Sequence, residues 1–342
     1  MKTKEMYYIG IDIHKKNHRF FIKKADGDRV DDGTIPSTKT ALIAWASQID
    51  HPWKGAMEAT LFTGWVYDTL KPFAQELVVG NPLRLKAITT AKNKNDRIDA
   101  ETLADLLRVN MIPRCYIAPP EMRDLRRVLR YRNYLVRSAT RLKNKTAGLL
   151  MECGVEYNKK KLHHKGYFHD LLGRLEEVPD SVIEMLRFNR GMMETFEKIQ
   201  KRLIRALKNQ PLLKERVERL QTIPAVGEIM ALTWALEIVD PHRFRSIRRA
   251  ISYCGLCSGE HSSGEKSMRR PISKQRNKHL QWALIEVAKA APRHSAHFAE
   301  IYTQELEKSN ANQATLKVAR KMLAYLLAID KSGKTFELRE KK

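Results

Sequence analysis

Four acidic side chains in the first hundred residues have the type and spacing expected of a metal site. They are Asp12, Glu58, Asp96 and Asp99. Asp96 and Asp99 stand three residues apart in a stretch of helical character, so both carboxylates can point to one side of a helix. Magnesium takes one or two carboxylates together with substrate phosphates, and two such ions about 4 Å apart stabilise both oxygens of a phosphoryl displacement. The pattern predicts a Mg²⁺ or Mn²⁺ site that acts on phosphate esters.

The alternative is that each acid is a turn residue or a helix cap, the commoner role of a lone aspartate at the end of a strand. The joint pattern favours a metal site because the surrounding segments come in a suitable order. Asp12 lies in the apolar run 7–13, which is short enough for a buried strand, and Glu58 lies in a second such run, 54–59.

The first 110 residues alternate between predicted strands and helices. We predict strands over 7–13, 18–23, 28–35, 54–59 and 76–80, and helices over 38–48, 62–74, 82–90 and 96–109. Three antiparallel strands followed by alternating helix and strand is the order of a ribonuclease-H-like fold. The sequence therefore predicts an α/β, ribonuclease-H-like (RuvC-like) domain over residues 1–115, with a boundary in the proline-containing stretch 113–120.

Composition limits the function classes. The chain has 342 residues, enough for two or three domains, and 63 Lys and Arg against 39 Asp and Glu give a net charge of +24. This excess favours nucleic acid as the partner. We expect no membrane association and a cytoplasmic location, because the sequence has neither a long apolar run nor a signal peptide. Cys254 and Cys257 form a lone CxxC pair, for which reduced thiols are favoured over zinc.

Residues 121–222 are predicted to be helical, with a coiled-coil-like seam. The seam residues are Leu125, Val128, Leu129, Leu135, Ala139, Leu142 and Leu149. Five arginines fall on roughly one face of the same helix: Arg123, Arg127, Arg130, Arg137 and Arg141. A solvated charged face is the alternative, but acidic partners at i+4 are missing, so we predict a surface that binds nucleic-acid phosphates.

Two motifs stand out in the C-terminal segment. The run 223–227, Ile-Pro-Ala-Val-Gly, is similar to the hairpin of helix-hairpin-helix DNA-binding modules, in which Gly227 would let backbone N–H groups approach a phosphate. A plain helix cap with a glycine turn fits these residues equally well. Farther on, Ser263 precedes Gly264 among the cations Lys266, Arg269 and Arg270, which we predict to contact nucleic acid. A serine beside cations suits a nucleophile, and an ordinary loop is the alternative.

Together these motifs resemble the DEDD insertion-sequence transposases, a family that includes the Piv site-specific invertases and the bridge-RNA-guided serine recombinases. The resemblance covers nearly the whole chain, through residues 10–15, 57–60, 94–100, 223–227 and 262–266. The paired-aspartate motif at 94–100 is the most specific. One departure is the run 255–258, where the family often has a proline, and it leaves Ser258 as a minor rival to Ser263.

The resemblance implies a transposase or DNA recombinase of an insertion sequence that cuts and rejoins DNA. The four acids would hold the metal, and Ser263, with Ser262 as second choice, would join covalently to a DNA phosphate. The family also implies a homo-oligomer, with dimers pairing into a tetramer. In its guided members, a structured bridge RNA encoded by the element pairs with donor and target DNA.

The resemblance also implies a division of the remaining chain. Residues 121–222 would form a helical coiled-coil region for RNA or DNA binding and oligomerisation. Residues 223–330 would form a mainly α transposase domain that carries the serine.

Three other classes compete with this interpretation. A sugar kinase also opens on a Gly-Ile-Asp strand, but it needs glycine-rich nucleotide loops, which the sequence lacks. A Holliday-junction-resolvase-like nuclease fits the four acids but has no need of the C-terminal segment with its serine. A DNA-binding repressor fits the charge but leaves the acids unexplained. A Piv-type invertase, which works without a guide RNA, is the alternative within the family itself.

Overall fold

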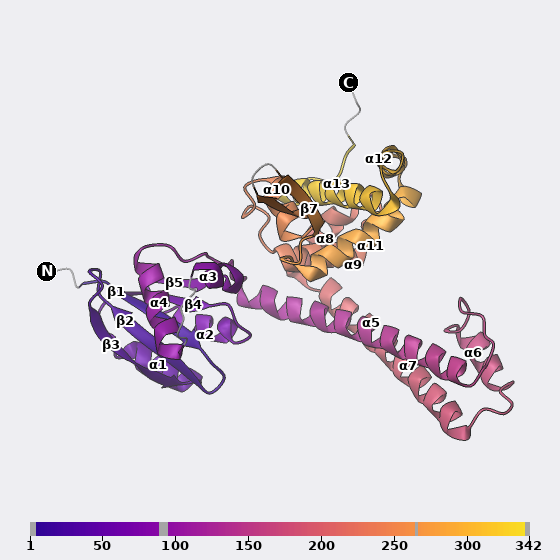
Figure 1. The fold of residues 1–342 in the computed structure, drawn as a ribbon, viewed down its shortest axis with the longest axis horizontal. Coiled ribbons are helices and arrows are strands. Elements are labelled where there is room, and N and C mark those ends of the chain that lie inside the picture. The colour runs from indigo at the N-terminus through magenta and orange to yellow at the C-terminus, as the bar shows by residue number, and fades with distance from the viewer. Residues whose placement is uncertain (1–4, 89–94, 264–265, 339–342) are drawn as a thin grey trace. The chain divides into compact units, whose positions relative to one another are not determined.

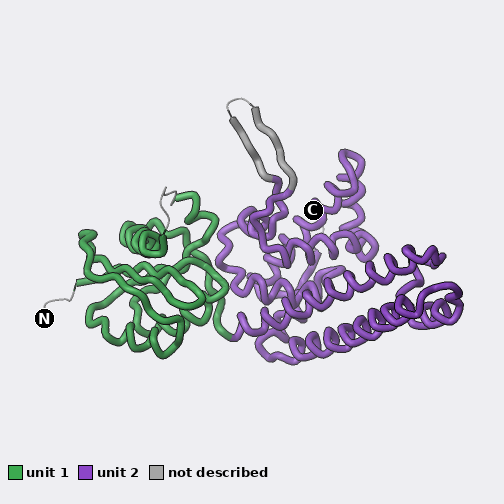
Figure 2. Tube along the Cα trace, turned by 60° about the horizontal axis from the view of Figure 1, so that its bottom comes forward, with its two compact units in different colours: residues 1–120 green, residues 121–342 purple. Residues whose placement is uncertain are grey.

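The chain divides into two compact units, residues 1–120 and 121–342 (Figure 2). The computed structural model describes residues 5–88, 95–263 and 266–338, and the side chains of 259–271 lie outside the description. Residues 121–222 and the C-terminal segment belong to one unit, so the further division at residue 222 stays a prediction. Within the described ranges, no helix combines the length and apolar character needed to cross a membrane.

Unit 1 is built on a five-stranded sheet with strand order β3-β2-β1-β4-β5 (Figure 1). The strands are β1 Tyr7–Ile13, β2 Asn17–Lys23, β3 Arg29–Pro36, β4 Trp53–Glu58 and β5 Glu76–Gly80. The first three strands are antiparallel neighbours, whereas β4 pairs in parallel with both β1 and β5. The prediction of a mixed α/β N-terminal domain is confirmed, and the sheet is compatible with a ribonuclease-H-like fold.

Helices cover both faces of this sheet. The helices in the described part of the unit are α1 Lys39–Ser47, α2 Thr63–Leu70, α3 Pro82–Ile88 and α4 Asp96–Arg108. Side chains of α1 and α2 share one core with Ile9, Ile11 and Ile13 of β1. Because side chains alternate along a strand, Gly10 and Asp12 face the opposite side, where α4 packs.

Gly10 is what allows α4 to lie so close to β1. A Cβ atom at Gly10 would stand 1.9 Å from the carbonyl oxygen of Ala100 and 2.6 Å from the backbone nitrogen of Ala104. Any other residue would push the helix off the strand. The glycine of the Gly-Ile-Asp run thus has a packing role: it brings the first turns of α4 alongside Asp12.

Unit 2 is mostly helical. Its helices are α5 Pro120–Glu152, α6 Lys165–Leu172, α7 Asp180–Lys208, α8 Pro211–Gln221, α9 Glu228–Ile238, α10 Ile247–Tyr253, α11 Lys278–His294, α12 Ala296–Leu306 and α13 Ala311–Ser332. A two-stranded antiparallel sheet, β6 Ser258–Ser263 and β7 Lys266–Ile272, follows α10. Of the predicted seam on α5, Leu129, Leu135 and Leu149 are buried and the other members are partly exposed.

A buried carboxylate joins α5 to the C-terminal helices. Glu237 on α9 is 1% exposed, and Arg130 donates to both of its oxygens at 2.8 Å. Asn277 also donates to Oε2 at 2.8 Å. Burial opposes the charge, but the bonds from Arg130 and Asn277 outweigh it and hold the pKa of Glu237 below its ordinary value.

We expect Glu237→Gln to lower the free energy of unfolding by about 2–4 kcal/mol, because it breaks an ion pair of a buried carboxylate. The half-exposed side chain of Arg130 limits the loss, since water can still solvate its charge. The pKa of folded Glu237 lies below its unfolded value. Its stabilisation is therefore complete above the unfolded value and is lost as the pH falls through the folded one. Urea unfolding should show a difference between wild type and variant that is full at neutral pH and narrows below about pH 4.

The matched control is Glu215→Gln, since Glu215 makes an exposed ion pair with Arg219 at 3.7 Å. Pairs of this kind contribute roughly 0–1 kcal/mol. Equal losses in the two variants would show that the Glu237 network does not stabilise unit 2.

Candidate metal centre and nucleic-acid interface

Two of the predicted acids lie near the C-terminal ends of neighbouring parallel strands, Asp12 one residue before the end of β1 and Glu58 at the end of β4. Ile11 of β1 pairs with Met57 of β4, so the next residues along, Asp12 and Glu58, come side by side at the same edge of the sheet. Ala56, two residues before Glu58, belongs to the core beneath α4. Glu58 therefore lies on the same face of the sheet as Asp12. The Asp12 side chain is only 16% exposed.

The other two acids open α4. Asn95 caps the helix by accepting a hydrogen bond from the backbone N–H of Ile98 at 2.8 Å, and Asp96 and Asp99 occupy the first turn. Negative charge is favoured at a helix N-terminus, so both acids also stabilise the start of α4. The negative charges of Asp96 and Asp99 are close enough to Asp12 to raise the pKa of its carboxyl group.

His14 joins this cluster, and the sequence interpretation did not assign it a role. Its Nε2 atom lies 2.8 Å from Oδ2 of Asp12 and 3.4 Å from Oδ1 of Asp96. The signal was present, since His14 stands two residues after Asp12 and alternation puts i and i+2 on one face. Spacing along the chain does not show which groups His14 faces, and only the position of α4 does.

The cluster perturbs both titrating groups at its centre. Burial raises the pKa of Asp12, the hydrogen bond from His14 opposes this, and the charges of Asp96 and Asp99 raise it further, so the net shift is upward. Burial lowers the pKa of His14, but its bond to Asp12 and the neighbouring carboxylates outweigh burial, so the net shift is again upward. Acids that repel one another at a half-buried position are stabilised by a cation among them.

The donor set fits a divalent cation. One ligand atom from each of Asp12, His14 and Asp96 can be chosen so that all lie within 4.8 Å of one another. Carboxylate oxygens suit Mg²⁺ and Mn²⁺, whereas an imidazole nitrogen is more typical of transition metals. Asp12, Asp96 and His14 are thus the residues best placed to hold a metal, with Glu58 and Asp99 beside them.

A buried aspartate outside the predicted set anchors the metal-site helix. Asp32 of β3, whose side chain is 5% exposed, makes ion pairs with Arg19 of β2 and with Arg29. Its Oδ2 atom also lies 3.4 Å from Nε of Arg97, the residue directly after Asp96 on α4. Arg19 pairs in register with Asp12. Asp32 thereby links β2, which pairs with the site strand β1, to the helix α4 that carries Asp96 and Asp99, and spacing along the chain does not reveal this link.

The basic face of α5 is partly paired with acids. The sequence predicts five arginines without acidic partners at i+4, and for two of them the prediction of a face without acidic partners is wrong. Arg127 in fact pairs with Asp124 at 2.6 Å, and Arg130 is held by Glu237. The i+4 rule missed both partners, because one is at i−3 and the other comes from a different helix. Arg137 and Arg141 are exposed, and a nucleic-acid role for the five arginines stays a prediction.

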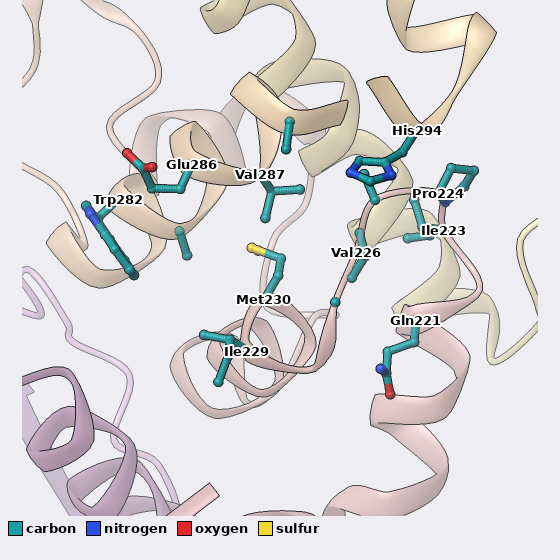
Figure 3. A pocket seen from close by; sticks show the side chains of 14 residues that line it. Gln221, Ile223, Pro224, Val226, Ile229, Met230, Trp282, Glu286, Val287 and His294 are labelled. Atoms are coloured by element: carbon teal, nitrogen blue, oxygen red, sulfur yellow. The ribbon is translucent and has the colours of Figure 1, made fainter. Parts of the chain in front are cut away.

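The C-terminal motif at 223–227 forms the connection between α8 and α9. Ala225 has a left-handed backbone with φ of 69°, and Gly227 is the N-cap residue of α9 without a side-chain cap. The turn and the facing helix α11 line a cavity of about 520 Å³, with Pro224, Met230 and Trp282 around it (Figure 3). A Cβ atom at Gly227 would meet nothing within 4 Å, so this position is open to a ligand.

The predicted nucleophile lies in the β6–β7 hairpin. Ser263 is the last residue of β6, and its backbone pairs with that of Lys266 in β7. The side chains of Ser262, Ser263, Lys266, Arg269 and Arg270 are outside the described part, so their predicted roles remain predictions. Cys254, just before the hairpin, is buried, and burial raises the pKa of its thiol to about 12. It is therefore a neutral thiol, unsuited to be a nucleophile.

Comparison with known proteins gives the family. A model for DEDD-type IS110 transposases matches residues 9–154, and a model described as "Transposase IS116/IS110/IS902 family" matches residues 217–303. Together they cover most of both units.

Curated relatives agree with these two matches. The transposase for insertion sequence element IS1111A of Coxiella burnetii is 28% identical over 249 residues, which span 69% of this chain and 66% of the relative. The transposase for insertion sequence element IS1328 of Yersinia enterocolitica is 26% identical over 71% of this chain and 74% of its own. A probable family 20 transposase of Pseudomonas aeruginosa is 26% identical over 75% and 80%.

The two matched regions contain the acid cluster at one end of the chain and the serine hairpin at the other. The chain belongs to the IS110-type family of transposases, enzymes that cut and join DNA.

Proposed function

We propose that this chain moves an insertion sequence by cutting and rejoining DNA at a four-carboxylate metal site with the help of a serine nucleophile. The observation that carries the proposal is the convergence of Asp12, Asp96 and His14 in a chain of this family. Glu58 lies at the end of the neighbouring strand β4, and Asp99 lies three residues after Asp96 in the first turn of α4.

The residues of unit 1 would hold and orient the reacting phosphate. A bound Mg²⁺ or Mn²⁺ supplies Lewis-acid polarisation of the phosphoryl oxygens. Asp12, Glu58, Asp96 and Asp99 provide the oxygens that bind the ion. His14 keeps Asp12 in place through their hydrogen bond, and Asp32 holds the first turn of α4 through Arg97. The carboxylates are thus fixed before DNA arrives, which reduces the cost of ordering them.

Ser263 would supply the covalent step. Attack by its hydroxyl oxygen forms a phosphorus–oxygen bond to the serine and breaks the bond to the departing deoxyribose oxygen, which takes up the proton. A hydroxyl of a second strand then attacks the serine ester, restores a DNA phosphodiester and returns the proton to the serine. Bond number is conserved, so no energy source is needed.

We further propose a structured RNA partner and a homo-oligomer. Exposed arginines on a chain of charge +24 support a nucleic-acid partner, with guidance by a bridge RNA as the specific form. A dimer that pairs into a tetramer is supported by an apolar row along α7, in which Met185, Phe188, Met192 and Ile199 are 36–63% exposed.

The test uses cells that carry the chain and its complete element on a plasmid. Junction DNA measured by quantitative PCR reports recombination, and sequencing of the RNA that purifies with the protein reports the guide. We expect new junctions and an enriched RNA from the non-coding end of the element. Junctions formed by nuclease-treated protein without any enriched RNA would identify a Piv-type invertase instead. Metal-dependent cleavage that persists without residues 220–342 would indicate a resolvase-like nuclease.

The arginine face of α5 makes a quantitative prediction. Replacing the exposed Arg137 and Arg141 by Gln should flatten the dependence of log affinity on log salt by roughly one unit per lost phosphate contact. Lys289→Gln with Lys317→Gln is the control, since both lysines already pair with glutamates at 2.8 and 3.7 Å. An equal change of slope in the control would show that binding follows total charge and not this face.

A further inference from the structure

Two tyrosines stand side by side on the exposed face of α5. Tyr131 and Tyr134 are each 54% exposed, although tyrosine is a large, partly apolar residue. Their ring centroids are 5.9 Å apart and their planes meet at 31°. The two tilted rings thus form a small aromatic surface that is open to solvent.

Basic residues continue the same face in both directions. Arg127 lies four residues before Tyr131, Arg137 three residues after Tyr134, and Arg141 seven residues after Tyr134. Residues at such steps are neighbours on one side of a helix. The stretch from Arg127 to Arg141 extends about 21 Å along the helix axis. Arg137 is steadied by a hydrogen bond from its Nε to the carbonyl of Asn133.

Exposed aromatic rings suit two kinds of partner, a second copy of the chain or a nucleic-acid strand, and charge distinguishes between them. A second copy of the chain docking on this face would bring two rows of arginines together, which costs free energy. A nucleic-acid strand offers phosphates to the arginines and bases to the rings. Within a duplex the bases are already stacked on one another, so only unpaired bases can lie against a side chain.

We propose that Tyr131 and Tyr134 form a stacking platform for unpaired bases, with the flanking arginines binding the backbone of the same strand. This inference rests on the proposed nucleic-acid function and deepens it, since it assigns the face of α5 to single-stranded segments. The shared chemistry fits an RNA loop as well as a DNA strand opened during recombination.

The experiment measures binding of the full chain to a fluorescently labelled oligoadenylate of about 12 nucleotides, a length within the range that such surfaces cover. RNA, DNA of the same sequence and a duplex are titrated in parallel. In the double variant Tyr131→Ala with Tyr134→Ala, single-strand affinity should fall about tenfold or more. The salt slope should stay unchanged because no phosphate contact is lost, and duplex affinity should change little. A larger fall for RNA or for DNA identifies the strand.

Two further variants make the result specific. Tyr131→Phe with Tyr134→Phe keeps the rings and should retain binding. Phe73→Ala removes a ring that is 36% exposed in unit 1 and should have no effect. An equal loss in the Phe73 variant, or equal losses for single strand and duplex, would overturn the platform. The platform would also be overturned if the double alanine variant changed its oligomeric mass in light scattering without a change in its affinity for the single strand. A wild-type chain that binds none of the probes would instead contradict the proposed function itself.

Discussion

Asp12→Asn should abolish recombination while the chain still folds and still binds nucleic acid. Asp12 sits between the sheet and α4 with Asp96 and His14 in reach, so removing its charge takes away the best-placed ligand oxygen. If metal polarisation contributes about 4 kcal/mol, the rate should fall by about 10³. Asp99→Asn should behave in the same way. Junction formation in the plasmid assay measures the effect.

A second readout separates loss of metal from loss of chemistry. A ligand that binds only the folded state raises the unfolding temperature, so Mn²⁺ should stabilise the wild-type chain and not the Asp12 variant. The matched control is Glu101→Gln on the same helix, where Glu101 pairs with Lys23 at 3.0 Å and stands outside the cluster. Near-normal recombination by the Asp12 variant in Mg²⁺ would exclude the assigned site.

Ser263→Ala should block DNA cleavage as well as joining, because the proposed serine ester forms on the Ser263 hydroxyl. The loss of a nucleophile from a covalent enzyme costs on the order of 10⁴ to 10⁶ in rate. Trapping wild-type protein on a cleaved substrate should give a protein–DNA adduct that mass spectrometry maps to Ser263. Metal binding should be unchanged in this variant, which separates it from the Asp12 variant.

The neighbouring serines provide the controls. Ser262→Ala and Ser258→Ala should keep activity, and Ser258 is the exposed first residue of β6. An adduct on either of them would change the residue but keep the mechanism. Cleavage with no adduct on any serine would mean that water attacks the phosphate directly at the metal site.

The strands and helices of unit 1 were predictable because their signals are local. β1 and β4 are short apolar runs, and Asp26-Gly27-Asp28 marks a turn, where Gly27 has φ of 105°. The family's paired-aspartate motif also proved to be structurally local, since Asp96 and Asp99 share the capped first turn of α4. Strand periodicity and helix capping each act within a few residues.

Contacts between distant segments were not predictable. His14 enters the acid cluster only because Gly10 lets α4 approach β1, a matter of backbone clearance that no spacing rule contains. Arg97 reaches Asp32 across the sheet, and Arg130 finds Glu237 at a sequence separation of 107 residues. The face of a single helix gives no information on a carboxylate so far along the chain, so the sequence alone predicts arginines without acidic partners on α5.

The sequence by itself determined the order of the elements, the basic character of the chain and the acids that could hold a metal, because residue type and local periodicity carry that information. The tertiary structure decided which polar groups meet. It placed His14 with Asp12 and Asp96, and it made Arg130 the partner of the buried carboxylate of Glu237. The physical reason is that burial and electrostatic pairing depend on distances across the fold, and only packing sets those distances.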